Sequence, residues 1–107
     1  MKIFVSYTTR DSIINHQSLA ALVEPISIFG KPFIDLIHND SEDKQARVES
    51  ELKESNILLL LRTNSIQYSK WVKWEVTTAL NLGIPIKMIN VENMMPTNSQ
   101  LIAAIQG

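Results

Sequence analysis

A run of five consecutive aliphatic residues in the middle of the chain constrains the fold more than any other feature. Ile57 to Leu61 read Ile-Leu-Leu-Leu-Leu, with no polar residue in alternation. A strand that is apolar on both faces is typical of the centre of a parallel sheet, where helices cover both sides. The sequence therefore predicts a buried central strand at about residues 56–61.

Strand-like and helix-like segments alternate along the rest of the chain. Runs rich in apolar residues predict three more strands, at residues 2–7, 32–37 and 84–91. Helical patterns fall between them at residues 11–25, 41–54 and 69–80, and a last short helix follows residues 96–99 and runs through Leu101, Ile102 and Ile105. Asp11 or Ser12 is expected to cap the first helix. Pro25 is expected to end or kink that helix, because proline lacks the amide hydrogen and clashes with the preceding turn.

This order predicts a single α/β domain over residues 1–107, with right-handed crossovers between parallel strands. We expect a flavodoxin-like three-layer sandwich whose four-stranded sheet has the order 2-1-3-4. Such folds bind ligands at the carboxyl ends of the strands, where the strand order reverses. This rule selects residues that follow the first and third strands: Ser6, Tyr7, Thr8, Arg10, Arg62, Thr63 and Asn64.

The predicted helix at residues 69–80 begins at the same edge of the sheet. Trp71 and Glu75 are one turn apart and therefore lie on the same side of this helix. We expect both to lean over the crevice, whereas Trp74 is expected to point away from Trp71 and to be exposed or packed on a partner subunit. A stripe beside them is expected to face the core: Val72, Val76, Ala79 and Gly83.

Composition and short motifs exclude several classes of function. With 10 basic and 11 acidic residues, the chain has no basic field for a nucleic-acid backbone. It has no cysteine, and its two histidines have no ligand-like spacing, so no metal site is predicted. The loop after the first strand lacks the glycines that a phosphate-binding loop needs. No segment is typical of a signal peptide or a membrane span, so we expect a cytoplasmic protein.

Four short stretches, taken together, carry a resemblance to a known family. In chain order they are Phe4-Val5-Ser6-Tyr7 followed by Arg10-Asp11, Phe33-Ile34-Asp35, Glu54-Ser55-Asn56, and Ser69-x-Trp71-Val72-x-x-Glu75-Val76-x-Thr78-Ala79-Leu80. Over about residues 2–91 the chain resembles a TIR (Toll/interleukin-1 receptor) domain. The last stretch is similar to the Trp-x-x-x-Glu helix of TIR enzymes that cleave NAD⁺.

The resemblance implies that the chain is an NAD⁺ glycohydrolase or cyclase, with Glu75 catalytic and Trp71 lining the nucleotide pocket. NAD⁺ would be the substrate, with no separate cofactor. The family also implies self-association and a role in immune or antiphage signalling. Ser6, Tyr7, Thr8 and Thr63 would lie at the pocket, and Arg10 or Arg62 could meet the pyrophosphate as a bidentate donor.

The chain departs from the family pattern in two places. The loop at residues 38–43 lacks the glycine-proline signature of receptor-type TIR domains. The chain also stops after four strands where the family usually adds a fifth, so we expect either a minimal or a C-terminally truncated version. The open edge could be paired by another subunit.

Each assignment has an alternative. Glu75 could pair with Lys70 or Lys73 on the surface, Trp71 could be a core lid, and Asp35 could be a hydrogen-bond acceptor rather than an acid. At the level of function, the chain could be a non-catalytic assembly or nucleotide-sensing module. A nucleoside deoxyribosyltransferase-like enzyme is a third option, but that chemistry needs a second carboxylate besides Glu75.

Overall fold

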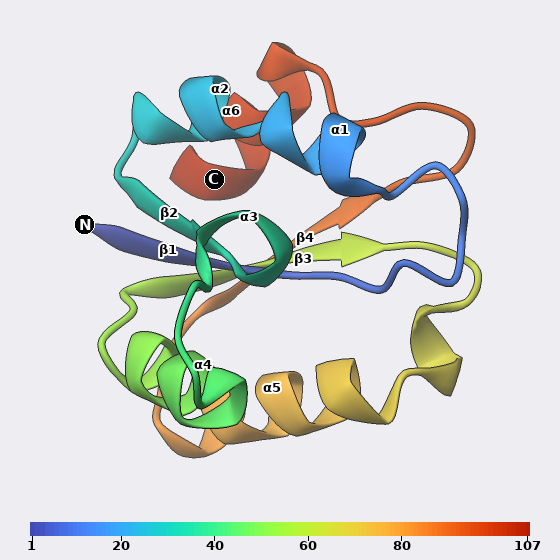
Figure 1. Cartoon of the computed structure of the whole chain (residues 1–107). Helices are drawn as coiled ribbons and strands as arrows, with labels where there is room; N and C mark the ends of the chain where they lie inside the picture. Colours follow the sequence, from blue (N-terminus) through green and yellow to red (C-terminus); the bar gives the residue numbers. More distant parts are fainter.

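Four parallel strands form the middle layer of the structure, a computed structural model that describes residues 1–107 (Figure 1). They pair in the order β2-β1-β3-β4, as the sequence predicts. The strands are β1 (Lys2–Ser6), β2 (Lys31–Ile34), β3 (Ile57–Arg62) and β4 (Ile86–Asn90).

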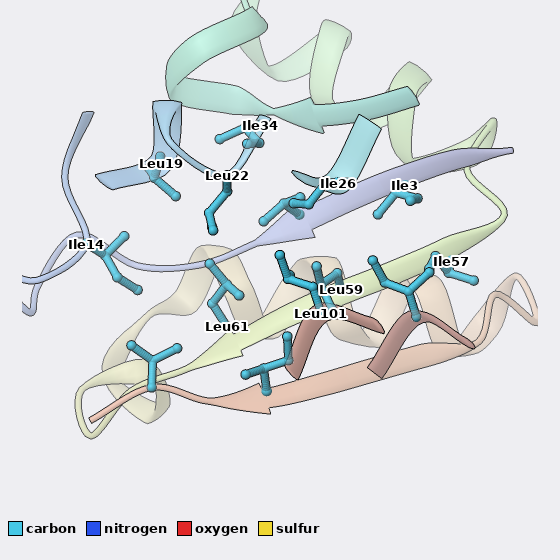
Figure 2. Close-up of a cluster of buried hydrophobic side chains, with 14 residues drawn as sticks. Ile3, Ile14, Leu19, Leu22, Ile26, Ile34, Ile57, Leu59, Leu61 and Leu101 are labelled. Atoms are coloured by element: carbon cyan, nitrogen blue, oxygen red, sulfur yellow. The ribbon is translucent and has the colours of Figure 1, made fainter. Parts of the chain in front are cut away.

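Helices cover both faces of this sheet and bury two separate cores. One face carries α1 (His16–Ala20), α2 (Val23–Ser27) and α6 (Asn98–Gln106), and the other carries α4 (Lys44–Lys53) and α5 (Lys70–Asn81) (Figure 1). The larger cluster holds 14 buried residues, among them Ile3, Val5 and Leu59 (Figure 2). The smaller holds 7, among them Phe4 and Leu58. Adjacent residues of one strand thus enter opposite cores, which explains why β3 is apolar from Ile57 to Leu61.

The strand register fixes which residues meet at the carboxyl edge of the sheet. Val5 lies opposite Ile34 of β2 on one side and opposite Leu59 of β3 on the other. The next residue along β1 is Ser6, and the next after β2 is Asp35. The register therefore places Asp35 level with Ser6, at the end of the sheet where the crevice was expected.

The second strand is shorter than predicted. It ends at Ile34, and the following residues form a short helix, α3 (Asp35–His38), instead of extending the strand to residue 37. Two side chains hold this turn by accepting backbone hydrogen bonds: the Leu36 N–H donates to the Tyr7 hydroxyl (2.9 Å) and the Ile34 N–H to Nδ1 of His38 (2.9 Å). Tyr7 is distant in the sequence, so periodicity could not reveal this turn.

The first helix also differs from its prediction. The structure has two short helices, α1 and α2, and the cap of α1 is Asn15 in a capping box with Ser18, rather than Asp11 or Ser12. Pro25 neither ends nor kinks a helix, because it lies in the first turn of α2. The amide hydrogens of a first turn have no partner within the helix, so proline is tolerated there.

Two predicted positions on α5 are wrong. Gly83 lies beyond the end of the helix with a φ of +72°, a left-handed conformation that favours glycine after a helix, and so it belongs to no core stripe. Trp74 does not point away from Trp71: the two rings stack at 5.5 Å, and Trp74 packs against the smaller core cluster.

The two outer strands of the sheet are β2 and β4. Met88 of β4 is 49% exposed. Pairing of this edge by another subunit stays a prediction.

None of the helices combines the length and hydropathy that crossing a membrane requires.

Candidate active site

A cavity of about 270 Å³ lies at the carboxyl ends of β1 and β2, beside the first turns of α5. Its walls come from β1 and the loop after it, from α3, and from α5 with its N-cap: Val5, Tyr7, Thr8, Thr9, Asp35, Leu36, Ser69, Trp71 and Glu75. This is the edge of the sheet that the strand order selects for ligands. Four predicted site residues, namely Tyr7, Thr8, Trp71 and Glu75, meet in this cavity.

Glu75 projects from α5 toward the end of β1. Its side chain is buried, with 3% of the residue exposed, and its Oε1 accepts a hydrogen bond of 2.8 Å from the Ser6 hydroxyl. None of the three ion pairs in the structure includes Glu75. The alternative in which Lys70 or Lys73 neutralises this carboxylate on the surface is therefore wrong. Ser6 lies behind the cavity wall and holds Glu75 instead of walling the pocket itself.

The surroundings of Glu75 favour its protonated form. Burial raises the pKa of this carboxyl group from 4.5 to about 8, and the nearby charge of Asp35 adds to the effect. The contacts with Ser6 and Trp71 act in the opposite direction. A buried acid without a cationic partner prefers to be neutral. Near pH 7 the empty site therefore holds a protonated Glu75 that a positively charged ligand could ionise.

Trp71 contributes an aromatic wall. It is 39% exposed and lines the cavity, so it is not a core lid. The ring stacks on Trp74 with an interplanar angle of 21°, and Trp74 is anchored in the smaller core. The stack fixes the orientation of Trp71, whose ring is suited to pack against a flat ligand ring.

Tyr7 closes the cavity on the side of α3. Burial raises the pKa of its hydroxyl to about 12, so the group keeps its proton at neutral pH. The oxygen already accepts from the Leu36 N–H. Its own hydrogen is therefore free to be donated to a ligand.

The sequence analysis missed Asp35 as a member of the site. Its half-buried carboxylate lines the same cavity as Glu75 and accepts a hydrogen bond of 2.7 Å from Nδ2 of Asn39. The strand-order rule selects the ends of the first and third strands, between which the order reverses, and therefore does not point to Asp35 at the end of β2. Asp35 is thus an acceptor, as one interpretation held, but it also faces the site.

Besides Ser6, three further predicted site residues lie outside the cavity wall. Arg10 and Arg62 are exposed, and neither lines the cavity, so their contact with a pyrophosphate stays a prediction. Thr63 is buried, and its hydroxyl has no hydrogen-bond partner. No group of three or more histidine, aspartate or glutamate side chains is arranged to hold a metal ion.

The raised pKa of Glu75 predicts a particular dependence of stability on pH. The folded state holds the Glu75 proton up to about pH 8, whereas the unfolded chain loses it near 4.5. Between these values the folded state binds more protons, so its stability falls as pH rises. Relative to a Glu75→Gln variant, the wild type should lose on the order of 4 kcal/mol of unfolding free energy between pH 5 and pH 9.

Urea denaturation of both proteins across this pH range measures that difference. A difference that does not change with pH would mean that Glu75 is already ionised at pH 5, which contradicts its burial without a partner.

The fold is similar to a solved structure of a 2-deoxyribosyltransferase from the psychrotolerant bacterium Bacillus psychrosaccharolyticus. The TM-score is 0.57 over 97% of this chain and 82% of that chain, with 12% sequence identity. At this identity the likeness shows the fold alone. No curated protein matches the sequence significantly.

A family model described as "Thoeris protein ThsB, TIR-like domain" matches residues 4–95, which is most of the chain. The match confirms the TIR resemblance, and the flavodoxin-like sheet order agrees with it. The chain therefore belongs to the TIR-like domain family of the Thoeris protein ThsB.

Proposed function

We propose that this protein cleaves the bond between nicotinamide and ribose in NAD⁺, releasing nicotinamide and an ADP-ribose product. One observation carries the proposal: Glu75 is buried in the wall of a cavity beside Trp71 and is not paired with any cation. The Thoeris family is one of antiphage defence, so we place the reaction in defence or stress signalling.

The chemistry fits the residues around the cavity. When the bond from ribose C1′ to the ring nitrogen breaks, the electron pair stays on the nitrogen and nicotinamide leaves as a neutral molecule. Positive charge then develops on the ribose, as it does in glycoside hydrolysis. The Glu75 carboxylate can stabilise this charge. Water then adds to C1′ and loses a proton in hydrolysis, or a nucleophile of the ADP-ribose moiety adds in cyclisation.

The size of the cavity supports binding of only one end of the dinucleotide. Ligand pockets are typically about 300–1,000 Å³, and this one is about 270 Å³. It can enclose a nicotinamide ring stacked on Trp71 together with its ribose. The pyrophosphate and adenosine would then extend over the open rim.

Loss of the Glu75 carboxylate should abolish turnover. We expect Glu75→Gln, which keeps the shape of the side chain, to lower the rate of nicotinamide release by about 100-fold or more, because the charge stabilisation of the transition state is lost. Chromatography of the products measures this release. Glu92→Gln, which alters an exposed carboxylate outside the cavity, serves as the matched control.

The assay requires high protein concentration and conditions that promote assembly, because self-association is expected for this family. If the wild type releases no nicotinamide there, the enzymatic proposal fails. Binding of ADP-ribose without turnover would then favour a nucleotide-sensing module.

Activity should also depend on pH in a direction set by Glu75. The free protein holds a protonated Glu75 below about pH 8, and the proposed role needs the carboxylate. The value of kcat/KM reports the ionisation of free enzyme, so it should rise with pH and level off above about 8. A profile measured from pH 6 to 9.5 that is flat or falls would contradict this role.

A second candidate function is nucleoside deoxyribosyl transfer. It is considered because Asp35 supplies the second carboxylate in the cavity that this chemistry needs. The expected product would be an exchanged nucleoside when the protein is incubated with thymidine and free adenine. No exchange, together with nicotinamide release from NAD⁺, would leave the first proposal alone.

A further inference from the structure

We propose that Asp35 makes this cavity selective for a positively charged ligand ring, so that the site takes a pyridinium riboside and rejects its neutral counterpart. The inference rests on the proposed function in one respect, because both place the nicotinamide ring and its ribose in this cavity. It adds the class of ligand and the residue that selects it.

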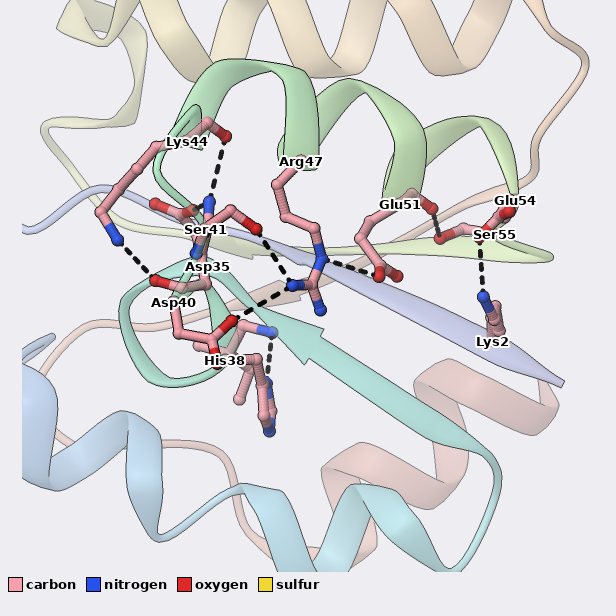
Figure 3. A network of polar contacts seen from close by, with 12 residues as sticks. Lys2, Asp35, His38, Asp40, Ser41, Lys44, Arg47, Glu51, Glu54 and Ser55 are labelled. Carbon is pink, nitrogen blue, oxygen red and sulfur yellow. Dashed lines mark hydrogen bonds and ion pairs between the residues drawn. The ribbon is translucent and has the colours of Figure 1, made fainter.

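The first support is that a network of hydrogen bonds holds the Asp35 carboxylate in place (Figure 3). Nδ2 of Asn39 donates to Oδ1 of Asp35 at 2.7 Å and also to the Lys44 carbonyl at 3.0 Å. Oδ1 of Asn39 accepts from the Ser41 N–H at 3.2 Å, and Asn39 itself is buried, with 9% exposed. The Asn39 side chain that orients Asp35 is thus itself held in place, because its Nδ2 and its Oδ1 both make hydrogen bonds to the backbone.

The second support is the rigid attachment of α3, which carries Asp35. The helix is tied at Leu36 to the Tyr7 hydroxyl, and its closing residue His38 accepts from the Ile34 N–H through Nδ1. Burial and the charge of Arg47 lower the pKa of His38, so its ring stays neutral and Nδ1 remains an acceptor. Asp35 is therefore presented to the cavity on a short helix with two anchors.

The third support is the absence of any positive charge from the cavity wall. None of its nine lining residues is a lysine, an arginine or a histidine. The cations near α3 are engaged elsewhere: Arg47 pairs with Asp40 at 3.4 Å and with Glu51 at 3.0 Å, and Nζ of Lys44 donates to the Asn39 carbonyl at 2.6 Å. Asp35 takes part in none of these ion pairs.

The charge of Asp35 disfavours ionisation of Glu75 in the same cavity, whose wall holds no cation. A cationic ligand relieves this repulsion, whereas a phosphate group would add to it. The cavity therefore favours the pyridinium ring of an oxidised nicotinamide nucleotide. The phosphates of such a ligand are expected to stay outside, at the rim of the cavity. It also favours the substrate over the product, because nicotinamide leaves as a neutral molecule.

Asp35 acts on binding and not on the chemical step. It attracts a charge that the ligand already carries before the bond breaks, and such binding lowers KM without raising kcat. At about pH 9, where Glu75 is ionised in both proteins, Asp35→Asn should therefore raise KM for NAD⁺ about tenfold while kcat changes by less than about threefold. A variant that merely loosened the site would lower kcat as well.

The decisive experiment measures binding in the Glu75→Gln background, where turnover is suppressed. Calorimetry compares nicotinamide riboside, whose ring is cationic, with its neutral dihydro form. We expect the cation to bind about tenfold more tightly, which corresponds to about 1.4 kcal/mol. Adding Asp35→Asn should remove the preference. Adding Glu42→Gln, a change at an exposed carboxylate outside the cavity in the same segment, should leave it intact.

The preference should also shrink with added salt, because screening weakens a charge interaction but not ring stacking. This salt test needs no variant of Asp35 and applies even if Asp35→Asn does not fold. Equal binding of the two ligands, or a preference that survives both Asp35→Asn and high salt, overturns the inference. Cation selectivity without any cleavage of NAD⁺ would overturn the proposed function but leave this inference standing.

Discussion

The hydrogen bond between Ser6 and Glu75 ties together the two halves of the site. Ser6 is the last residue of β1, and Glu75 lies in the second turn of α5, 69 positions later in the chain. The bond is buried, and it holds a carboxyl group at the meeting point of the sheet edge, the Trp71 wall and the cavity. A single hydroxyl orients this acid but supplies no positive charge, so burial keeps Glu75 protonated near neutral pH. A fixed orientation together with the missing cationic partner is what makes the cavity a site rather than a gap in packing.

The fold follows from a few physical constraints that can be recognised in the sequence. Residues 57–61 are apolar on both faces, which requires two covering layers, and the alternation of strands and helices then sets the parallel order. The Trp71 and Glu75 side chains could be placed over the crevice because helical spacing and the strand-order rule both constrain them. Apolar runs and helical spacing are regular patterns of residues that lie close together in the chain, so they can be predicted from the sequence.

The features that could not be predicted depend on contacts between distant residues. The end of β2 is set by Tyr7, which accepts from the backbone of residue 36, and no local pattern encodes that bond. The position of Asp35 follows from that early end of the strand. The predicted direction of the Trp74 side chain is wrong because a helical projection does not represent the side-chain rotamer. The Trp74 ring turns onto Trp71 and still packs against the smaller core. Long, exposed side chains such as Arg10 have no unique position that periodicity could determine.

The central claim is that Glu75 is a buried, unpaired acid that a cationic ligand converts into a carboxylate. Carbon-13 NMR of the Glu75 carboxyl group, followed through a pH titration, tests this most directly. The structure predicts a midpoint near 8 in the free protein, and a lower midpoint once nicotinamide riboside is bound, because a nearby positive charge favours the ionised form. A midpoint near 4.5 in the free protein, unchanged by the ligand, would contradict the account.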